Sequence, residues 1–169
     1  MAFFLPDAYF ERVSGITPSF LEEKGIRGLL LDVDNTLALH NDPDLPPFVS
    51  SWLKTMRVHH IAMIIVSNNS RKRVAPFAKK VGLPFISMAW KPLPWGFSRG
   101  IRQLGLRKSE TAAVGDQLYT DLVGAKFCRI TAILLDPIRE ESSGFLAGKR
   151  RKQKRWLKKH HLRPQKVSD

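Results

Sequence analysis

Short apolar runs recur along this chain of 169 residues, and polar turn residues follow most of them directly. Four runs cover residues 26–31, 61–66, 111–114 and 130–135, and a weaker one covers 84–88. Short apolar runs bounded by turn signals are typical of buried strands. Because helical segments separate them, the pattern indicates βαβ units. The sequence therefore predicts an α/β fold with a doubly wound parallel sheet and helices on both faces.

The segments between the runs have the spacing of amphipathic helices. They cover residues 48–60, 71–81, 92–104 and 118–128. The second of these is expected to end at Gly82, because glycine readily adopts the left-handed conformation that closes many helices. Crossovers between parallel strands are expected to be right-handed.

Two segments lie outside this alternation. In the N-terminal lead segment, Asp7 and Thr17 are expected to cap two short helices. Residues 136–148 are expected to form a loop. We therefore divide the chain into a domain over residues 1–148, which includes the lead segment, and a basic C-terminal tail over residues 149–169.

The tail carries most of the net charge of +13. Residues 149–169 hold ten lysines and arginines and one aspartate, so they supply +9 of that charge. Such a segment binds anionic surfaces: nucleic acid, acidic lipid or an acidic protein. The composition leaves two structures open, a basic helix with limited apolar content or a solvated, disordered run.

The sequence contains no apolar run of about 18 residues, so a transmembrane helix is not expected. The apolar start, residues 1–5, lacks the basic region and the cleavage site of a secretory signal. The single cysteine, Cys128, excludes an intramolecular disulfide framework. These features predict a cytoplasmic protein. Its basic tail could bind peripherally to the inner face of the membrane.

Polar clusters follow the expected strands. They are Asp32-Val33-Asp34-Asn35-Thr36, Ser67-Asn68-Asn69, Lys91-Pro92, and Gly115-Asp116 through Asp121. In open α/β sheets, ligands bind outside the carboxyl ends of the strands. We therefore expect the four clusters to converge on one crevice.

This crevice would hold the carboxyl groups of Asp32, Asp34, Asp116 and Asp121. Like charges this close repel, and burial raises the cost, so a cation is expected among them. Mg²⁺ fits best, because it takes oxygen ligands from a few carboxylates and keeps several waters. The lysine and the serine of the other clusters add a positive charge and a hydroxyl group. Together they fit a phosphoryl group that a carboxylate can attack.

The clusters resemble the signature of the haloacid dehalogenase-like (HAD) superfamily. The Asp-x-Asp-x-Thr pattern covers residues 32–36, Ser67 and Lys91 match the second and third motifs, and Gly-Asp-x-x-x-x-Asp covers 115–121. Ser-Asn-Asn, Lys-Pro and Gly-Asp-Gln-Leu-Tyr-Thr-Asp resemble the YqeG-type phosphatases of subfamily IIIA. Those are similar to the mitochondrial phosphatidylglycerophosphate phosphatases. The resemblance implies a HAD-like Rossmannoid fold and phosphatase activity.

The resemblance also implies the catalytic roles. Asp32 would attack phosphorus and form an aspartyl-phosphate, while Asp34 would act first as general acid and then as general base. Mg²⁺ would be held by the Asp32 carboxylate, the Asp34 main-chain carbonyl and Asp116.

Further roles follow from the same resemblance. Ser67 and the amide of Asn68 would bind the phosphoryl oxygens, and Lys91 would neutralise the aspartyl-phosphate. Asp121 would orient the lysine or a metal-bound water, and Thr36 would fix the loop beside the site.

The motif spacing leaves no room for a cap domain. Asp34 and Ser67 are 33 residues apart, and Ser67 and Lys91 are 24 residues apart. In each case, one helix and one strand account for most of the residues in between. The site is therefore expected to be uncapped and open to a large or membrane-borne phosphomonoester. Phosphatidylglycerophosphate is the substrate hypothesis, and it rests partly on the resemblance.

Other functions stay open from the sequence. Basic stretches with a tryptophan bind RNA through phosphate contacts and stacking, so the chain could be an RNA- or ribosome-associated protein on a HAD core. An open site also admits phosphoproteins and nucleic-acid ends as substrates. Nucleic acid is less favoured as a partner than an anionic membrane surface.

Overall fold

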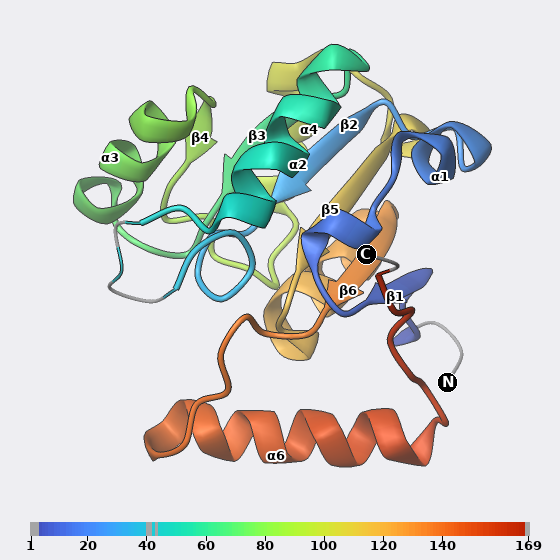
Figure 1. Cartoon of the computed structure of the whole chain (residues 1–169), viewed down its shortest axis with the longest axis vertical. Coiled ribbons are helices and arrows are strands. Elements are labelled where there is room, and N and C mark those ends of the chain that lie inside the picture. Colours follow the sequence, from blue (N-terminus) through green and yellow to red (C-terminus); the bar gives the residue numbers. More distant parts are fainter. Residues whose placement is uncertain (1–3, 40–41, 43, 168–169) are drawn as a thin grey trace.

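The computed structural model describes residues 4–39, 42 and 44–167. Residues 1–3 of the apolar start and the last two residues of the basic tail lie outside the described residues. The described residues form one parallel sheet with the strand order β1-β6-β5-β2-β3-β4 (Figure 1). Its strands are β1 (Ala8–Phe10), β2 (Gly28–Leu31), β3 (Ala62–Val66), β4 (Phe85–Ile86), β5 (Thr111–Gly115) and β6 (Thr131–Leu135).

Helices connect the strands and cover the sheet. They are α1 (Pro18–Glu23), α2 (Pro47–Val58), α3 (Arg71–Val81), α4 (Trp95–Leu104), α5 (Val123–Cys128) and α6 (Gly144–Lys159). A π-helical turn over Leu118–Leu122 leads into α5, where the sequence predicted one continuous helix. Helix α3 ends at Gly82 in the left-handed conformation, as predicted.

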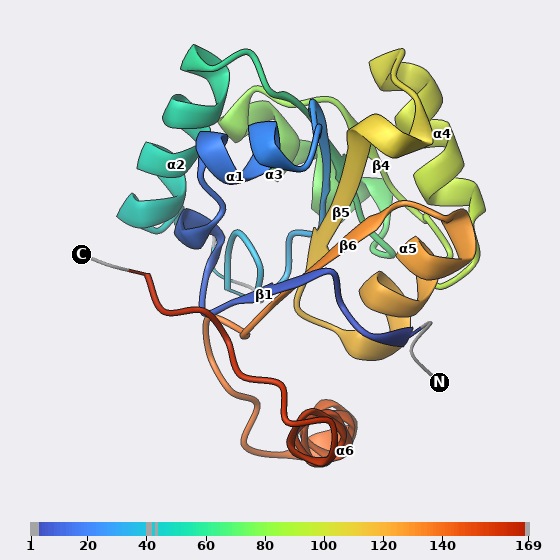
Figure 2. The same cartoon turned by 90° about the vertical axis from the view of Figure 1, so that its right-hand side faces the viewer.

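The two faces of the sheet carry separate cores. Along β2, Leu29 and Leu31 belong to one core together with Trp52 of α2, while Leu30 belongs to the other together with Phe97 of α4. This alternation follows from the two-residue period of a strand. Helices α1, α2 and α3 lie on one face and α4 and α5 on the other (Figure 2), so the doubly wound fold is confirmed.

The chain between the motifs is short in the structure. One loop and α2 connect β2 to β3, and α3 alone connects β3 to β4. The uncapped architecture predicted from the spacing is therefore confirmed.

The lead segment differs from the expectation of two capped helices. Thr17 does cap α1, because its Oγ1 accepts a hydrogen bond from the main-chain N–H of Phe20 at 3.1 Å. Asp7 caps no helix; its carboxylate accepts hydrogen bonds from the N–H of Ala132 at 2.7 Å and from Lys126 at 2.8 Å. These contacts fix the start of β1, an edge strand that was not expected from the sequence.

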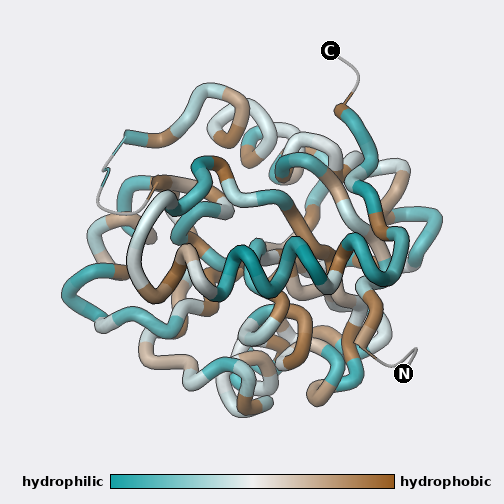
Figure 3. Tube along the Cα trace, turned by 90° about the horizontal axis from the view of Figure 1, so that it is seen from below, coloured by the Kyte–Doolittle hydropathy of each residue, from teal (hydrophilic) through white to brown (hydrophobic). Residues whose placement is uncertain are grey.

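The basic tail is helical. Helix α6 begins at Gly144, inside the segment expected to be a loop, and runs past the carboxyl ends of the strands (Figure 1). Most of its length is hydrophilic (Figure 3). Its buried side chains repeat every three or four residues: Ala147, Arg150, Gln153 and Leu157. No helix in the described part of the chain is long and apolar enough to span a membrane. The division into residues 1–148 and 149–169 stays a proposal.

Candidate active site

The polar clusters meet at the carboxyl ends of β2, β3, β4 and β5, around a cavity of about 230 Å³. Its lining consists of Asp32, Asp34, Asn35, Ser67, Asn68, Asn69, Lys91, Gln117, Thr120, Glu141, Leu146 and Lys149. Five of the eight predicted site residues are in this lining. The other three, Thr36, Asp116 and Asp121, are buried next to it and contact one another or the lining residues, as described below.

Lys91 joins two of the carboxylates. Its Nζ lies 2.7 Å from Asp32 Oδ1 and 2.6 Å from Asp121 Oδ1, and all three side chains are almost fully buried. Burial alone would lower the pKa of Lys91, but Asp121 and Asp32 raise it above its ordinary value. The lysine therefore stays charged. Burial raises the pKa of Asp32 to about 8, although Lys91 acts in the opposite direction.

The carboxylates of Asp32, Asp116 and Asp121 form a buried cluster. One oxygen of each lies within 4.8 Å of the others. Burial raises the pKa of Asp116 to about 6, and the charge of Asp121 contributes to this rise. Lys91 and Arg150 supply two positive charges against these three carboxylates, so one negative charge is left in excess. Such a set of hard oxygen ligands fits a divalent metal ion.

Gly115 allows Asp121 to come this close. A Cβ atom at Gly115 would lie 2.2 Å from Asp121 Cγ, which is far inside van der Waals contact. The glycine of the Gly-Asp motif therefore has a packing reason: it makes room for the carboxylate that contacts Lys91.

Asp34 lies at the mouth of the cavity. Its Oδ2 accepts a hydrogen bond from Asn69 Nδ2, and its Oδ1 lies 2.9 Å from Arg73 Nη2 on the first turn of α3. Its side chain is 20% exposed, so it can reach both a substrate and solvent. Arg73 is not predicted from the sequence, because an arginine in the first turn of a helix carries no motif of its own.

The loop after β3 holds Ser67 and Asn68. Ser67 Oγ lies in the cavity lining and accepts a hydrogen bond from the main-chain N–H of Asn69 at 3.2 Å. The Asn68 side chain pairs with the main chain of Lys91: Nδ2 donates to its carbonyl at 3.0 Å, and Oδ1 accepts from its N–H at 2.7 Å. Asn68 thus fixes the backbone that carries the lysine.

Asp116 is held from two sides. Thr36 Oγ1 donates to its Oδ1 at 3.1 Å. From α6, the Arg150 guanidinium pairs with its Oδ2 and donates to its main-chain carbonyl at 2.6 Å. Gln153 donates to the same carbonyl at 2.8 Å. The carboxylate is therefore oriented by the loop after β2 and by α6.

Glu141 extends this network. Its Oε2 lies 2.9 Å from Arg150 Nε, and its Oε1 accepts from Asn35 Nδ2 at 2.8 Å. Arg150, Glu141 and Gln153 were not selected from the sequence. Arg150 is one of ten basic residues in the tail, and only the spacing of Ala147, Arg150, Gln153 and Leu157 could have marked the side of the helix that is buried.

A model of the haloacid dehalogenase-like hydrolases matches residues 19–128, which is more than half of the chain. The chain belongs to this family. The match includes every residue predicted for the site and ends before α6. The HAD resemblance inferred from the four motifs is thereby confirmed, and the reaction class is hydrolysis.

Individual relatives agree with the family assignment. The probable phosphatase YqeG of Bacillus subtilis (strain 168) is 38% identical over 144 residues, which cover 85% of this HAD protein and 83% of YqeG. A 4-nitrophenylphosphatase from Thermotoga maritima superposes with a TM-score of 0.61 at 13% identity, over 86% of this chain and 95% of that one.

An uncharacterized protein from Listeria monocytogenes serotype 4b gives a TM-score of 0.58 at 17% identity, over 70% of this chain and 85% of that one. At these identities the two solved structures show that the fold is shared. The sequence relative shows that the likeness extends beyond the motifs to most of the chain.

Proposed function

We propose that this HAD-family protein is a metal-dependent phosphatase that hydrolyses phosphomonoesters through an aspartyl-phosphate on Asp32. The observation that carries the proposal is the position of the Asp32 carboxylate. It lies in the lining of the open cavity, paired with Lys91 and within 4.8 Å of the carboxylates of Asp116 and Asp121. The name of the Bacillus subtilis relative, a probable phosphatase, supports the same reaction.

In the first step, a carboxylate oxygen of Asp32 attacks phosphorus, and the bond between phosphorus and the leaving oxygen breaks. Asp34 gives its proton to the leaving alcohol. Lys91 balances the negative charge on the acyl phosphate, and the Ser67 hydroxyl donates to a phosphoryl oxygen. Arg73 and Asn69 hold the Asp34 carboxylate in place between the two steps.

In the second step, Asp34 takes a proton from a water molecule, whose oxygen attacks phosphorus. The bond between phosphorus and the Asp32 oxygen breaks, which releases inorganic phosphate and restores the free carboxylate. A Mg²⁺ ion held by Asp32, the Asp34 main-chain carbonyl and Asp116 would supply positive charge beside the phosphoryl oxygens. Asp121 and Thr36 are positioning residues, since they contact Lys91 and Asp116.

The proposed substrate is a large, membrane-borne phosphomonoester, with phosphatidylglycerophosphate as the first candidate. In the described part of the chain no inserted domain covers the cavity, so the rest of a bulky substrate can extend away from it. Lys149 and Leu146 of the basic helix α6 form part of its lining, which would bring the cavity close to an anionic lipid surface. A peripheral location at the inner face of the membrane follows from this proposal.

The test is phosphate release from phosphatidylglycerophosphate in mixed micelles and from 4-nitrophenyl phosphate, each with Mg²⁺ and with EDTA. We expect Mg²⁺-dependent release from both, lost in Asp32→Asn by at least about 10³-fold, because the nucleophile is removed. Asp44→Asn is the matched control, since the Asp44 side chain is 92% exposed.

The outcomes separate the reaction from the substrate. Wild-type activity in a folded Asp32→Asn protein would contradict the nucleophile. Release from the aryl ester but not from the lipid would keep the phosphatase and direct the substrate search to phosphoproteins and nucleic-acid ends.

A further inference from the structure

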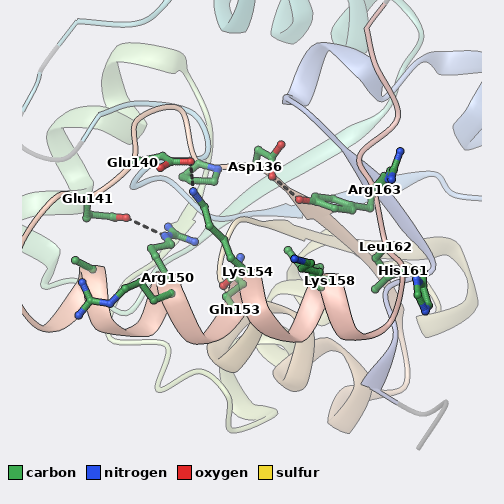
Figure 4. Close-up of a pocket in the computed structure, with 15 residues that line it drawn as sticks. Asp136, Glu140, Glu141, Arg150, Gln153, Lys154, Lys158, His161, Leu162 and Arg163 are labelled. Carbon is green, nitrogen blue, oxygen red and sulfur yellow. Dashed lines mark hydrogen bonds and ion pairs between the residues drawn. The ribbon is translucent and has the colours of Figure 1, made fainter.

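A larger cleft lies between α6 and the β1 edge of the sheet (Figure 4). Its volume is about 970 Å³. Tyr9 of β1, Asp136 after β6, and residues 161–163 after α6 contribute to its walls. The Arg150–Glu141 ion pair lies between this cleft and the catalytic cavity, and Glu141 lines both. The cleft is therefore a second concave site, separate from the catalytic residues.

Every carboxylate in the cleft lining already has a partner within the protein. The pairs are Asp136 with the Tyr9 hydroxyl, Glu140 with Lys154, and Glu141 with Arg150. Figure 4 shows the last two of these pairs spanning from the loop after β6 to α6. Cations therefore neutralise Glu140 and Glu141, whereas Asp136 is hydrogen-bonded to a neutral hydroxyl. With five lysines and arginines against three carboxylates, the lining still carries a net positive charge.

Three cations of the lining are left over. Among the described residues, Arg151, Lys158 and Arg163 have no carboxylate within ion-pair distance, and all three are exposed. They lie on α6 and on the segment that follows it, so they approach the cleft from two elements. Three unpaired positive charges beside a concave site favour an anionic ligand, and the two guanidinium groups suit the oxygens of a phosphate.

Part of the cleft lining is apolar. Leu157 and Tyr9 are each 7% exposed and pack in one small core, with Leu162 packed against it. Ala147 and Pro137 extend this surface. A cleft lined by both apolar residues and exposed cations fits a ligand that has an apolar body and an anionic head.

The frame of the cleft is fixed by main-chain hydrogen bonds. The N–H of Gln165 donates to the carbonyl of Tyr9 at 2.8 Å, and the N–H of Glu11 donates to the carbonyl of Gln165 at 3.2 Å. The segment after α6 is therefore paired with β1 and holds residues 161–163 in position. Such a preformed frame reduces the entropy cost of binding a ligand.

We propose that this cleft binds a phosphate ester with an apolar body, at a site distinct from the catalytic cavity. The cations Arg151, Lys158 and Arg163 would bind the phosphate, and the surface of Leu157, Leu162 and Tyr9 would bind the apolar part. The volume lies near the upper end of the range for small-molecule sites, which leaves room for both parts.

Two kinds of molecule carry such a phosphate ester: a phospholipid and a small soluble ester. The test uses the full-length protein and two phosphodiesters, which a phosphomonoesterase does not consume: dihexanoylphosphatidylglycerol below its micellar concentration, and glycerophosphoglycerol, the same head without chains. Isothermal titration calorimetry measures the dissociation constants. We expect saturable binding of the lipid, at least tenfold tighter than binding of the head alone.

The variant Lys158→Gln/Arg163→Gln removes two cations of the cleft. We expect it to weaken lipid binding at least tenfold while 4-nitrophenyl phosphate turnover stays unchanged. Lys152→Gln/Lys159→Gln is the matched control: it removes the same charge from the same region, but neither residue lines the cleft. We expect less than a twofold change in that control.

Three results would overturn the proposal. No saturable binding to the wild-type protein would mean that the cleft takes neither probe. Equal weakening in both double variants would show attraction by overall charge. Equal affinity for the lipid and the head alone would show that the apolar part of the lining takes no part.

Discussion

Arg150 is the residue of the basic helix α6 that pairs with the carboxylate of Asp116, a proposed metal ligand. It is 8% exposed, and its guanidinium contacts both the carboxylate and the main-chain carbonyl of Asp116. A side chain that orients a metal ligand from behind tunes metal binding as strongly as some of the ligands do. One arginine among ten basic residues of the tail therefore has a role that charge alone does not explain.

Arg150→Lys is expected to lower the apparent Mg²⁺ affinity about 10- to 100-fold, the usual cost of losing such a partner. Lysine keeps the charge but lacks the planar fork that contacts two oxygens of Asp116 at once. The measurement is a Mg²⁺ titration followed both by turnover and by the thermal midpoint. Arg155→Lys, on the exposed side of α6, is the control. A folded Arg150→Lys protein with unchanged Mg²⁺ affinity would refute this role.

Gly115→Ala tests the close packing around Asp121. The added methyl group would lie 2.2 Å from Asp121 Cγ, so the carboxylate must move away from Lys91. We expect a loss of about 1 to 3 kcal/mol in unfolding free energy, typical of overpacking, together with a fall in kcat. Urea denaturation and steady-state kinetics measure the two effects.

Gly148→Ala adds the same methyl group, but here we expect the unfolding free energy to rise instead of fall. Nothing lies within 4 Å of a Cβ at Gly148, which is inside α6. Alanine is favoured over glycine in helices, so we expect stabilisation by up to about 1 kcal/mol. Destabilisation by both substitutions to a similar extent would contradict the steric account of Gly115.

At the scale of elements, the sequence predicted five of the six strands and the convergence of the four motifs, because apolar runs and the polar residues after them are local signals. Strand β1 has three residues and depends on β6 and on Gln165 for its hydrogen bonds, so no local pattern predicts it. The contacts of α6 could not be predicted from local sequence patterns either. Its buried side includes Arg150 and Gln153, which look solvent-exposed in the sequence but face Asp116 in the structure.

The docking of α6 depends on few apolar contacts. Leu157 is the buried helix residue in the small core with Tyr9 and Leu134, and the partly buried Trp156 packs against the same core. Leu157→Ala is expected to cost about 2 to 5 kcal/mol of local stability, which favours detachment of α6 from the sheet. Hydrogen exchange should then be faster in α6 than in β2 or β5, and Mg²⁺ affinity should fall as Arg150 leaves Asp116.

Phe145→Ala is the control for that experiment, since Phe145 is on the same helix and 77% exposed. We expect no change in exchange or in Mg²⁺ affinity. If Leu157→Ala left the exchange of α6 unchanged, the helix would be held by its polar contacts instead.

At the scale of the whole molecule, the candidate active site is assembled from the connections that follow β2, β3, β4 and β5 and from α6. Asp32 and Asp121 are 89 positions apart in the sequence, yet both contact the same lysine. Such a site forms only when the chain is folded, and it then brings three buried carboxylates together. The folded protein therefore gains from a bound cation, whereas the unfolded chain has no equivalent site.

This linkage predicts that Mg²⁺ stabilises the whole domain. At a concentration of about 100 times the dissociation constant, binding to the folded state alone adds about 2.7 kcal/mol of unfolding free energy. For a domain of this size, that raises the thermal midpoint by about 5 to 10 °C relative to EDTA. Asp116→Ala removes one of the three carboxylates and should abolish most of this shift, while Asp44→Asn should keep it. An equal midpoint with and without saturating Mg²⁺ in the wild-type protein would mean that the acidic cluster does not bind this ion, and the metal part of the proposed mechanism would fail with it.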